Sequence, residues 1–256
     1  MTAAALDHSL ARTVVIRARR ETVFRYFTDT ARWAAWWGQG STIDARPGGA
    51  MRIRYPDGTE AVGEVIEVAA PARIVFTYGY ASGTPIPAGG SRVTIDVDAH
   101  ESGSRVRLTH AFTDAAVRDQ HVQGWRFQLS LFGNVVANEV NKDPSSLVDA
   151  WFAAWAIADE EERRRALGTI AAPDVQFGDR FSVIDGCDEL VQHIGGAIRF
   201  MSGFRIQRKG DVRHCLGTLL VEWTASRGEN QQFATGTNVF VLNANGRIAS
   251  VTGFWN

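Results

Sequence analysis

Three segments of the first half alternate apolar and polar residues so regularly that they restrict this part of the chain to a sheet with one buried face. The segments are residues 73–80, 91–99 and 104–112. In the middle one, Val93, Ile95 and Val97 alternate with arginine, threonine and aspartate. Because successive side chains of a strand point to opposite faces, this pattern predicts an antiparallel sheet with one apolar and one wet face.

A long helix is expected directly after these strands. From Ala115 to about Asn138, apolar residues recur at helical intervals and no proline interrupts them. Such a helix is the natural cover for the apolar face of the sheet. The same patterns predict further elements before it, namely helices at residues 21–28 and 31–37 and strands at residues 13–18, 50–55 and 61–68.

The chain breaks at residues 141–144, where Asp143 is suited to cap a helix that starts at Pro144. Helices are predicted from residue 144, near residues 159–165 and over residues 188–200. Strands are predicted at residues 174–177, 204–213, 216–226, 231–242 and 247–255, with a hairpin turn at residues 243–246. We therefore predict an α+β protein of two domains, residues 1–141 and 142–256.

Composition argues against several classes of protein. Lys and Arg number 27 against 28 Asp and Glu, so the chain has no basic surplus for nucleic acid. The two cysteines, Cys187 and Cys215, form no disulfide framework and fit a reducing cytoplasm. Neither a secretion signal in residues 1–10 nor an apolar run of about 20 residues is present. We expect a soluble, cytoplasmic protein with no membrane span.

The usual cofactor and metal motifs are missing from the sequence. The six histidines have no metal-ligand spacing, no glycine-rich phosphate loop follows a strand, and no Gly-x-Ser-x-Gly elbow occurs. We expect no cofactor and no metal, and the pattern disfavours nucleotide chemistry and serine hydrolysis.

His110 is the polar exception on the predicted apolar face, where it shares the alternation of Val106, Leu108 and Phe112. A buried imidazole needs a hydrogen-bond partner, which is either a structural group or a ligand. Tyr55 and Tyr78 offer a similar apolar wall with a polar tip.

The strands of the second half differ, because residues 216–226 and 231–242 are apolar on both faces. A sheet of this kind must be covered on both sides, by its own helices and by something else. We therefore predict a homodimer through the second domain, with the first domain as the other candidate cover. The polar residues available to a second pocket are Asp179, His193, His214, Glu222 and Asn238.

Residues 13–140 resemble the START-like helix-grip superfamily, in the branch named after the heat-shock chaperone ATPase activator. The resemblance rests on motifs in the family's order: Val23-Phe24, Phe27-Thr28-Asp29, Trp36-Trp37-Gly38, Arg46-Pro47-Gly48-Gly49, Pro56-Asp57-Gly58, Gly63-Glu64-Val65, Arg73-Ile74-Val75-Phe76-Thr77, Leu108-Thr109-His110 and Gly124-Trp125. The chain departs from the family at Arg19-Arg20, where a proline is common, and in the loop of residues 81–90.

Residues 145–256 resemble the SnoaL-like, nuclear-transport-factor-2-like fold, a cone-shaped α+β barrel. The motifs are Asp174-Val175, Gly186-Cys187-Asp188-Glu189-Leu190, Trp223, Gly236, Val239-Phe240, Gly246-Arg247-Ile248 and Phe254-Trp255. Members often end the last strand with an acid, whereas this chain has Asn256, an amide that cannot act as a general base.

Both resemblances imply a cavity between a curved sheet and helices. The expected ligand-binding residues of the first domain are Trp36, Trp37, Tyr55, Phe76, Tyr78, His110, Phe112, Trp125 and Leu129. A second pocket would draw on His214, Glu222, Asn238 and Trp255. His193 and Asp179 are the candidate catalytic residues of that domain, because a carboxylate or imidazole in an apolar pocket is suited to acid–base work.

Three functions fit these observations. The first is binding of a small hydrophobic molecule, such as a lipid or polyketide, by a carrier or sensor. The second is a cofactor-independent cyclase or isomerase that uses acid–base residues in the pocket. The third, implied only by the family resemblance, is a chaperone ATPase-activating interaction. The fold alone does not distinguish these three functions.

Overall fold

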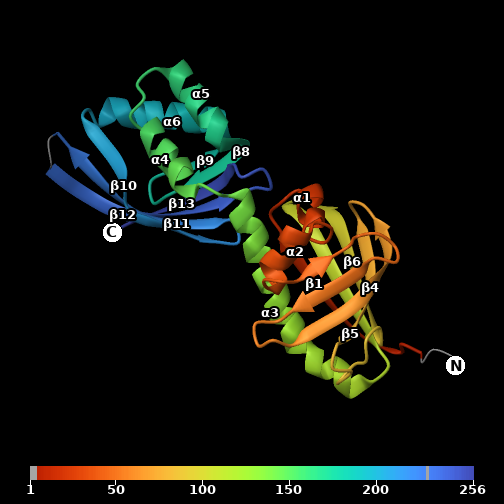
Figure 1. Ribbon diagram of the computed structural model, residues 1–256. Coiled ribbons are helices and arrows are strands. Elements are labelled where there is room, and N and C mark those ends of the chain that lie inside the picture. The colour runs from red at the N-terminus through yellow and green to blue at the C-terminus, as the bar shows by residue number, and fades with distance from the viewer. Residues whose placement is uncertain (1–4, 229–230) are drawn as a thin grey trace. The chain divides into compact units, whose positions relative to one another are not determined.

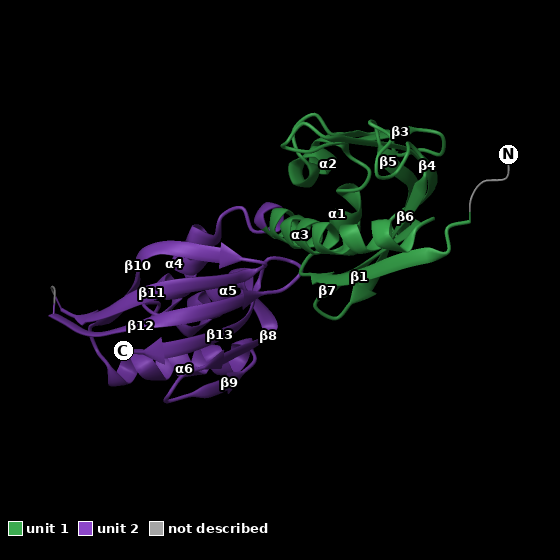
Figure 2. Cartoon of the chain, turned by 90° about the horizontal axis from the view of Figure 1, so that it is seen from below, with its two compact units in different colours: residues 1–137 green, residues 138–256 purple. Residues whose placement is uncertain are grey.

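The computed structural model describes residues 5–228 and 231–256, and residues 1–4 and 229–230 lie outside the described part. The chain divides into two compact units, residues 1–137 and 138–256 (Figure 2). Each unit combines helices with one sheet. The predicted α+β class is therefore confirmed.

The first unit is built on a seven-stranded antiparallel sheet in the order β1-β7-β6-β5-β4-β3-β2. Its strands are β1 (His8–Ile16), β2 (Thr42–Ile43), β3 (Ala50–Arg54), β4 (Glu60–Ala69), β5 (Arg73–Tyr80), β6 (Ser91–His100) and β7 (Gly103–Phe112). Its helices are α1 (Arg20–Arg25), α2 (Thr30–Trp37) and α3 (Ala115–Val140).

The predicted alternation is present along the central strands. Val93, Ile95 and Val97 of β6 are buried, whereas Arg92 and Asp98 on the other face are exposed. The sheet curves around α3, which covers the apolar face as expected (Figure 2). This arrangement is the helix-grip fold that the sequence resembles.

Aromatic side chains fill the space between α2, α3 and the sheet. Phe27 stacks on Phe132 of α3 with ring centroids 4.9 Å apart, and Trp36 of α2 packs against the same ring at 4.8 Å. Trp33 contacts Phe76 of β5 edge-on at 5.8 Å. These contacts form a close-packed core at one end of the sheet, where burial of large apolar area stabilises the fold.

The second unit contains a six-stranded sheet in the order β10-β11-β12-β13-β8-β9. Its strands are β8 (Ala171–Gly178), β9 (Val183–Asp185), β10 (Phe204–Cys215), β11 (Thr218–Arg227), β12 (Gln231–Leu242) and β13 (Ile248–Trp255). Its helices are α4 (Pro144–Ala154), α5 (Glu160–Ile170) and α6 (Cys187–Phe200). All three lie on the same side of the sheet (Figure 1).

The start of the second unit forms as the sequence predicts. Asp143 accepts a hydrogen bond from the backbone N–H of Ser146 at 3.0 Å, and Pro144 occupies the first helical position. The cap satisfies one of the N–H groups that the first turn leaves without a partner. On the inner side of the sheet, Trp151 of α4 meets Phe240 of β12 edge-on at 5.7 Å.

Some details of the topology were not predicted. β2 and β9 have two and three residues, too few for a periodic pattern. β8 pairs with β13 in parallel, so the second sheet is not wholly antiparallel. Leu216, expected in a strand, has φ 51° in the turn between β10 and β11. Within the described residues β10 and β9 are the edges of the sheet, which does not close into a barrel.

Candidate functional site

A cavity with a largely aromatic wall lies in each unit. The first cavity, in the first unit, has a volume of about 490 Å³, and the second cavity, in the second unit, about 450 Å³. Both volumes lie in the range of about 300–1,000 Å³ that is typical of small-molecule sites.

The first cavity lies between α2, α3 and the ends of β3 and β5. The lining residues are Ala35, Trp36, Trp37, Gly38, Tyr55, Pro56, Tyr78, Tyr80, Pro85, Gln120, His121, Gly124, Trp125, Phe127, Gln128 and Leu131. None of them carries a carboxylate, an ammonium or a guanidinium group. The wall is therefore aromatic, with neutral polar groups at a few points.

A pair of phenols supplies one of these polar points. The hydroxyls of Tyr55 and Tyr78 are 2.9 Å apart and share a hydrogen bond. Burial raises the pKa of Tyr55 to about 12 and raises the pKa of Tyr78 as well. Both hydroxyls thus stay protonated at neutral pH. One proton of the pair joins the two oxygens, and the Tyr78 hydroxyl also interacts with the side chain of Tyr80.

Tyr80 and His121 supply a second polar point, and the roles of their atoms follow from the contacts. His121 Nδ1 lies 2.8 Å from the carbonyl oxygen of Val117, which can only accept, so Nδ1 carries the proton. His121 Nε2 is then the acceptor for the Tyr80 hydroxyl at 3.2 Å. Burial lowers the pKa of His121, which favours this neutral form.

The structure does not place His110, an expected ligand contact, among the residues that line this cavity. The indole N–H of Trp125 donates to His110 Nδ1 at 3.0 Å, so Nε2 carries the proton and donates to Ser91 Oγ at 2.8 Å. Ser91 Oγ in turn donates to the carbonyl oxygen of Tyr78. Both ring nitrogens are therefore occupied. Burial, with a smaller contribution from His121, lowers the pKa of His110 to about 2.

The remaining predictions for the first domain divide into two groups. Trp36, Trp37, Tyr55, Tyr78 and Trp125 line the cavity. Phe76, Phe112 and Leu129 do not, because they lie within the packed core: Phe76 is against Trp33, and the Phe112 ring is 3.9 Å from that of His110.

Sequence reasoning missed several residues of α3 that line the first cavity. Gln120, His121, Gly124, Phe127, Gln128 and Leu131 share one helical face. Phe127 and Leu131 are 68% and 38% exposed. Their three- and four-residue spacing was visible in the sequence and would have indicated this face.

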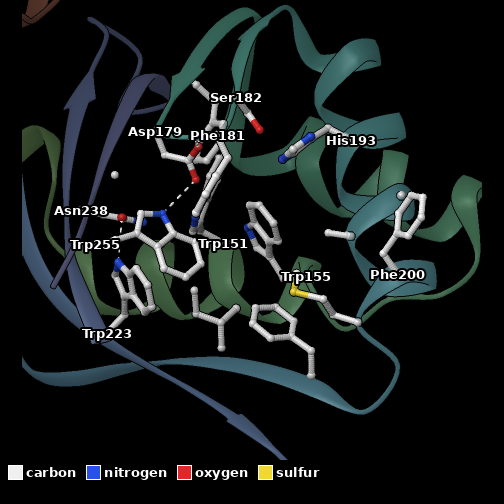
Figure 3. Close-up of a pocket in the computed structure, with 17 residues that line it drawn as sticks. Trp151, Trp155, Asp179, Phe181, Ser182, His193, Phe200, Trp223, Asn238 and Trp255 are labelled. Atoms are coloured by element: carbon white, nitrogen blue, oxygen red, sulfur yellow. Dashed lines mark hydrogen bonds between the residues drawn. The ribbon is translucent and has the colours of Figure 1, made fainter. Parts of the chain in front are cut away.

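The second cavity lies between the six-stranded sheet and α4 and α6 (Figure 3). Its lining residues are Trp151, Trp155, Phe177, Asp179, Phe181, Ser182, His193, Gly196, Ala197, Phe200, Met201, Phe204, Ile206, Trp223, Asn238, Gly253 and Trp255. Asp179 is the one lining residue with a carboxylate, and neither lysine nor arginine is among them.

Two tryptophans fix the polar groups of this wall. Trp255 Nε1 donates to Asp179 Oδ2 at 3.1 Å, and the backbone N–H of Phe181 donates to Asp179 Oδ1 at 2.8 Å. Trp223 Nε1 donates to Asn238 Oδ1 at 2.9 Å. Figure 3 shows Asp179 and His193 directed into the cavity from different sides. The ring nitrogens of His193 have no hydrogen-bond partner among the described residues.

Glycine at position 236 makes room for one of these tryptophans. Gly236 lies opposite Trp223 in the β11–β12 register. A Cβ atom there would lie 2.3 Å from the Trp223 ring. The missing side chain therefore lets the indole lie across β12.

Of the residues predicted for the second pocket, some line the second cavity and some do not. Asp179, His193, Asn238 and Trp255 line the second cavity. Glu222 does not, because it alternates with the inward-facing Trp223 and is exposed on the other face of β11. His214 does not either, because its Nε2 accepts the N–H of Gly217 at 3.1 Å and stabilises the β10–β11 turn.

The described residues were also compared with the requirements of a metal site and of a membrane-spanning helix. In the part of the chain that the structure describes, no three His, Cys, Asp or Glu side chains gather as a metal site would need. None of the described helices is long and apolar enough to span a membrane.

Comparison with solved structures gives partial matches, and no curated protein matches the chain. A SnoaL-like protein from Agrobacterium tumefaciens, proposed to be an isomerase, is 26% identical and covers 43% of this chain and 95% of its own, with a TM-score of 0.42. CalU16 from Micromonospora echinospora is 23% identical over 51% of this chain and 76% of its own, with a TM-score of 0.41. Protein MLL2253 from Mesorhizobium loti is 16% identical and covers 50% of this chain and 96% of its own, with a TM-score of 0.45.

These likenesses, all with TM-scores below 0.5, say nothing of what this chain does. The family comparison is more specific. Residues 17–137, just under half of the chain, match the model of the Activator of Hsp90 ATPase homolog 1-like proteins. The helix-grip unit is thus similar to this activator-like family over residues 17–137, as its motifs predicted.

Proposed function

We propose that the first cavity binds a small, uncharged hydrophobic molecule, and that the protein serves as its carrier or sensor. The observation that carries this proposal is a cavity of about 490 Å³ whose lining residues include no Asp, Glu, Lys or Arg. An ionic ligand would lose its hydration there without gaining a partner of opposite charge. An uncharged, mostly apolar ligand loses little hydration and buries apolar area.

The polar points of the wall favour a ligand with at least one acceptor oxygen. The Tyr55–Tyr78 pair places two protonated hydroxyl groups at the cavity wall. Trp37 also lines the cavity, and its buried indole nitrogen has no hydrogen-bond partner among the described residues, although such groups usually find one. A carbonyl or ether oxygen is the complementary group.

The same groups are poorly suited to catalysis. Raised pKa values keep Tyr55 and Tyr78 protonated, and His110 and His121 already use both ring nitrogens. A general base needs an acceptor atom within reach of the substrate. The first cavity therefore supports binding without a chemical step.

The test uses N-phenyl-1-naphthylamine, an uncharged fluorescent probe. We expect its emission to rise on binding, and the indole N–H signals of Trp36, Trp37 and Trp125 to shift in ¹H–¹⁵N spectra of the full chain. Shifts confined to Trp151, Trp155, Trp223 and Trp255 would place the probe in the second unit and contradict the proposal.

One observation favours a second function, a cofactor-independent isomerase or cyclase in the second unit. Asp179 and His193 line the same cavity, where a carboxylate and an imidazole could exchange protons with a bound ketone. The test is exchange of the α-protons of 2-tetralone in D₂O, followed by NMR. Exchange faster than in buffer, lost in both Asp179→Asn and His193→Gln, would support catalysis, and exchange at the buffer rate would oppose it.

A further inference from the structure

The second cavity differs from the first in the charge of its wall. Asp179 contributes a carboxylate, and no lysine or arginine lines the cavity. Asp179 forms no ion pair with any described residue. The neighbouring cation, Arg180, is exposed and lies over the Phe181 ring at 5.0 Å. Asp179 therefore gives this cavity an acidic group with no cationic partner among the described residues.

The carboxylate is held in place but keeps acceptor capacity. Its two oxygens receive the N–H groups of Trp255 and Phe181 at 3.1 and 2.8 Å. Because a carboxylate offers about four acceptor positions, two remain for a ligand. The orientation is fixed before a ligand arrives, which lowers the entropy lost on binding.

Space for a ligand group lies beside Asp179. Gly253 also lines the cavity, and a Cβ atom at that position would lie 3.3 Å from Asp179 Cβ and 3.2 Å from Asn238 Oδ1. The absence of a side chain there keeps the floor between the carboxylate and the amide open. His193, on another side of the cavity, has an acceptor nitrogen in its neutral form (Figure 3).

The rest of the wall is aromatic. Trp151, Trp155 and Trp255 line the cavity together with phenylalanines, and Trp223 meets Trp255 edge-on at 5.0 Å. The faces of tryptophan rings attract cations, most strongly where water is excluded. An aromatic wall with one carboxylate is therefore complementary to an organic cation rather than to a neutral or anionic molecule.

We propose that the second cavity is a binding site for a hydrophobic amine, an alkyl- or arylalkylammonium ion. The ammonium group pairs with Asp179, and the apolar part of the ligand lies among the tryptophans. This site is independent of the proposal for the first cavity. It gives the protein two ligand sites of different charge preference.

The test compares three probes of equal length by calorimetry on the full chain: 4-phenylbutylammonium, 4-phenylbutan-1-ol and 4-phenylbutanoate. We expect the ammonium ion to bind at least tenfold more tightly than the alcohol, and the carboxylate to bind most weakly. In ¹H–¹⁵N spectra the ammonium ion should shift the indole signal of Trp255, assigned with Trp255→Phe. Shifts limited to Trp36, Trp37 and Trp125 would contradict this site without affecting the first.

Asp179→Asn is the decisive variant because it removes the charge and keeps an oxygen for Trp255. We expect it to weaken ammonium binding at least tenfold and to leave alcohol binding nearly unchanged. Asp174→Asn, which neutralises an exposed carboxylate of β8 outside the cavity, is the matched control and should change neither.

A second variant covers the case in which Asp179→Asn fails to fold. Gly196 lies in α6 at the cavity wall, and a Cβ atom there meets nothing within 4 Å. Gly196→Leu should fill the cavity and abolish ammonium binding. Equal binding of ammonium ion and alcohol to the native protein, binding of none of the probes, or an ammonium preference that survives in either variant would overturn the proposal.

Discussion

Gly124→Leu is the sharpest test of the first cavity, because it should stabilise the protein while removing its ligand. Gly124 lies in the middle of α3 and lines the cavity, and a Cβ atom there would meet nothing within 4 Å. Its φ is not in the left-handed region, so a side chain introduces no backbone strain. The added leucine would extend into space that the ligand otherwise occupies.

The expected gain in stability has two parts. Replacing glycine by leucine in a helix interior stabilises it by about 0.7 kcal/mol, because glycine loses more backbone freedom on folding. Partial burial of the new side chain in the cavity adds about 1 kcal/mol. The sum, about 1.5–2 kcal/mol, corresponds to a rise of roughly 3–8 °C in the Tm of a domain of about 150 residues.

Binding should change in the opposite direction. We expect affinity for N-phenyl-1-naphthylamine, measured by fluorescence titration, to fall at least tenfold in Gly124→Leu. The control is Gly168→Leu at an exposed position of α5 that lines neither cavity, where a Cβ atom also meets nothing within 4 Å. It should gain similar helix stability and keep full affinity. A destabilised Gly124→Leu, or one that binds the probe normally, would refute the assignment of the cavity.

Three further predictions concern stability and assembly. Stability against urea should fall as the pH drops from 7.5 to 5, because the pKa of His110 is lowered to about 2 and the folded state cannot take up the proton that an unfolded histidine binds below about 6.5. Up to about 2 kcal/mol should be lost through this residue. His110→Gln should remove this share and leave that of His121, whose pKa burial also lowers, whereas an unchanged pH dependence would contradict the assignment. Trp125→Phe should cost about 1–3 kcal/mol in urea unfolding, because it leaves His110 Nδ1 buried without a donor, and no loss would show that the bond is absent. Phe254 is 54% exposed on the outer face of the second sheet, where we expect the dimer interface. In sedimentation experiments the wild-type protein should be a dimer and Phe254→Lys a monomer, and a monomeric wild type would exclude this interface.

Much of the fold could be predicted because local patterns agree with it. The strand at residues 73–80 and the strand at residues 231–242 coincide with β5 and β12. In both, β-branched or aromatic residues recur with a period of two, and turn residues mark the ends. β9 and the parallel pairing of β8 with β13 could not be predicted, because a three-residue strand has no period and pairing between distant segments leaves no local signal.

The position of His110 shows a different limit of sequence reasoning. Alternation along β7 correctly places the imidazole on the inner face, where it is fully buried. It cannot show that Trp125, on the following helix, lies close enough to donate to Nδ1. A buried histidine is a ligand contact only where a ring nitrogen is left unpaired, and pairing depends on the docking of α3 rather than on the strand.

The position of a residue along its strand, as well as its face, decides whether it lines a cavity. Phe76 and Tyr78 lie on the same face of β5, two residues apart, and both are almost fully buried. Phe76 meets Trp33 in the aromatic core, whereas Tyr78 reaches Tyr55 at the edge of the first cavity. On α3 the same division separates Phe132, which stacks on Phe27, from Gly124, whose missing side chain leaves the space open. The inner surface is thus close-packed where large rings of helix and sheet meet, and hollow where α3 presents a glycine, so the cavity exists because of Gly124 as much as because of the aromatic residues around it.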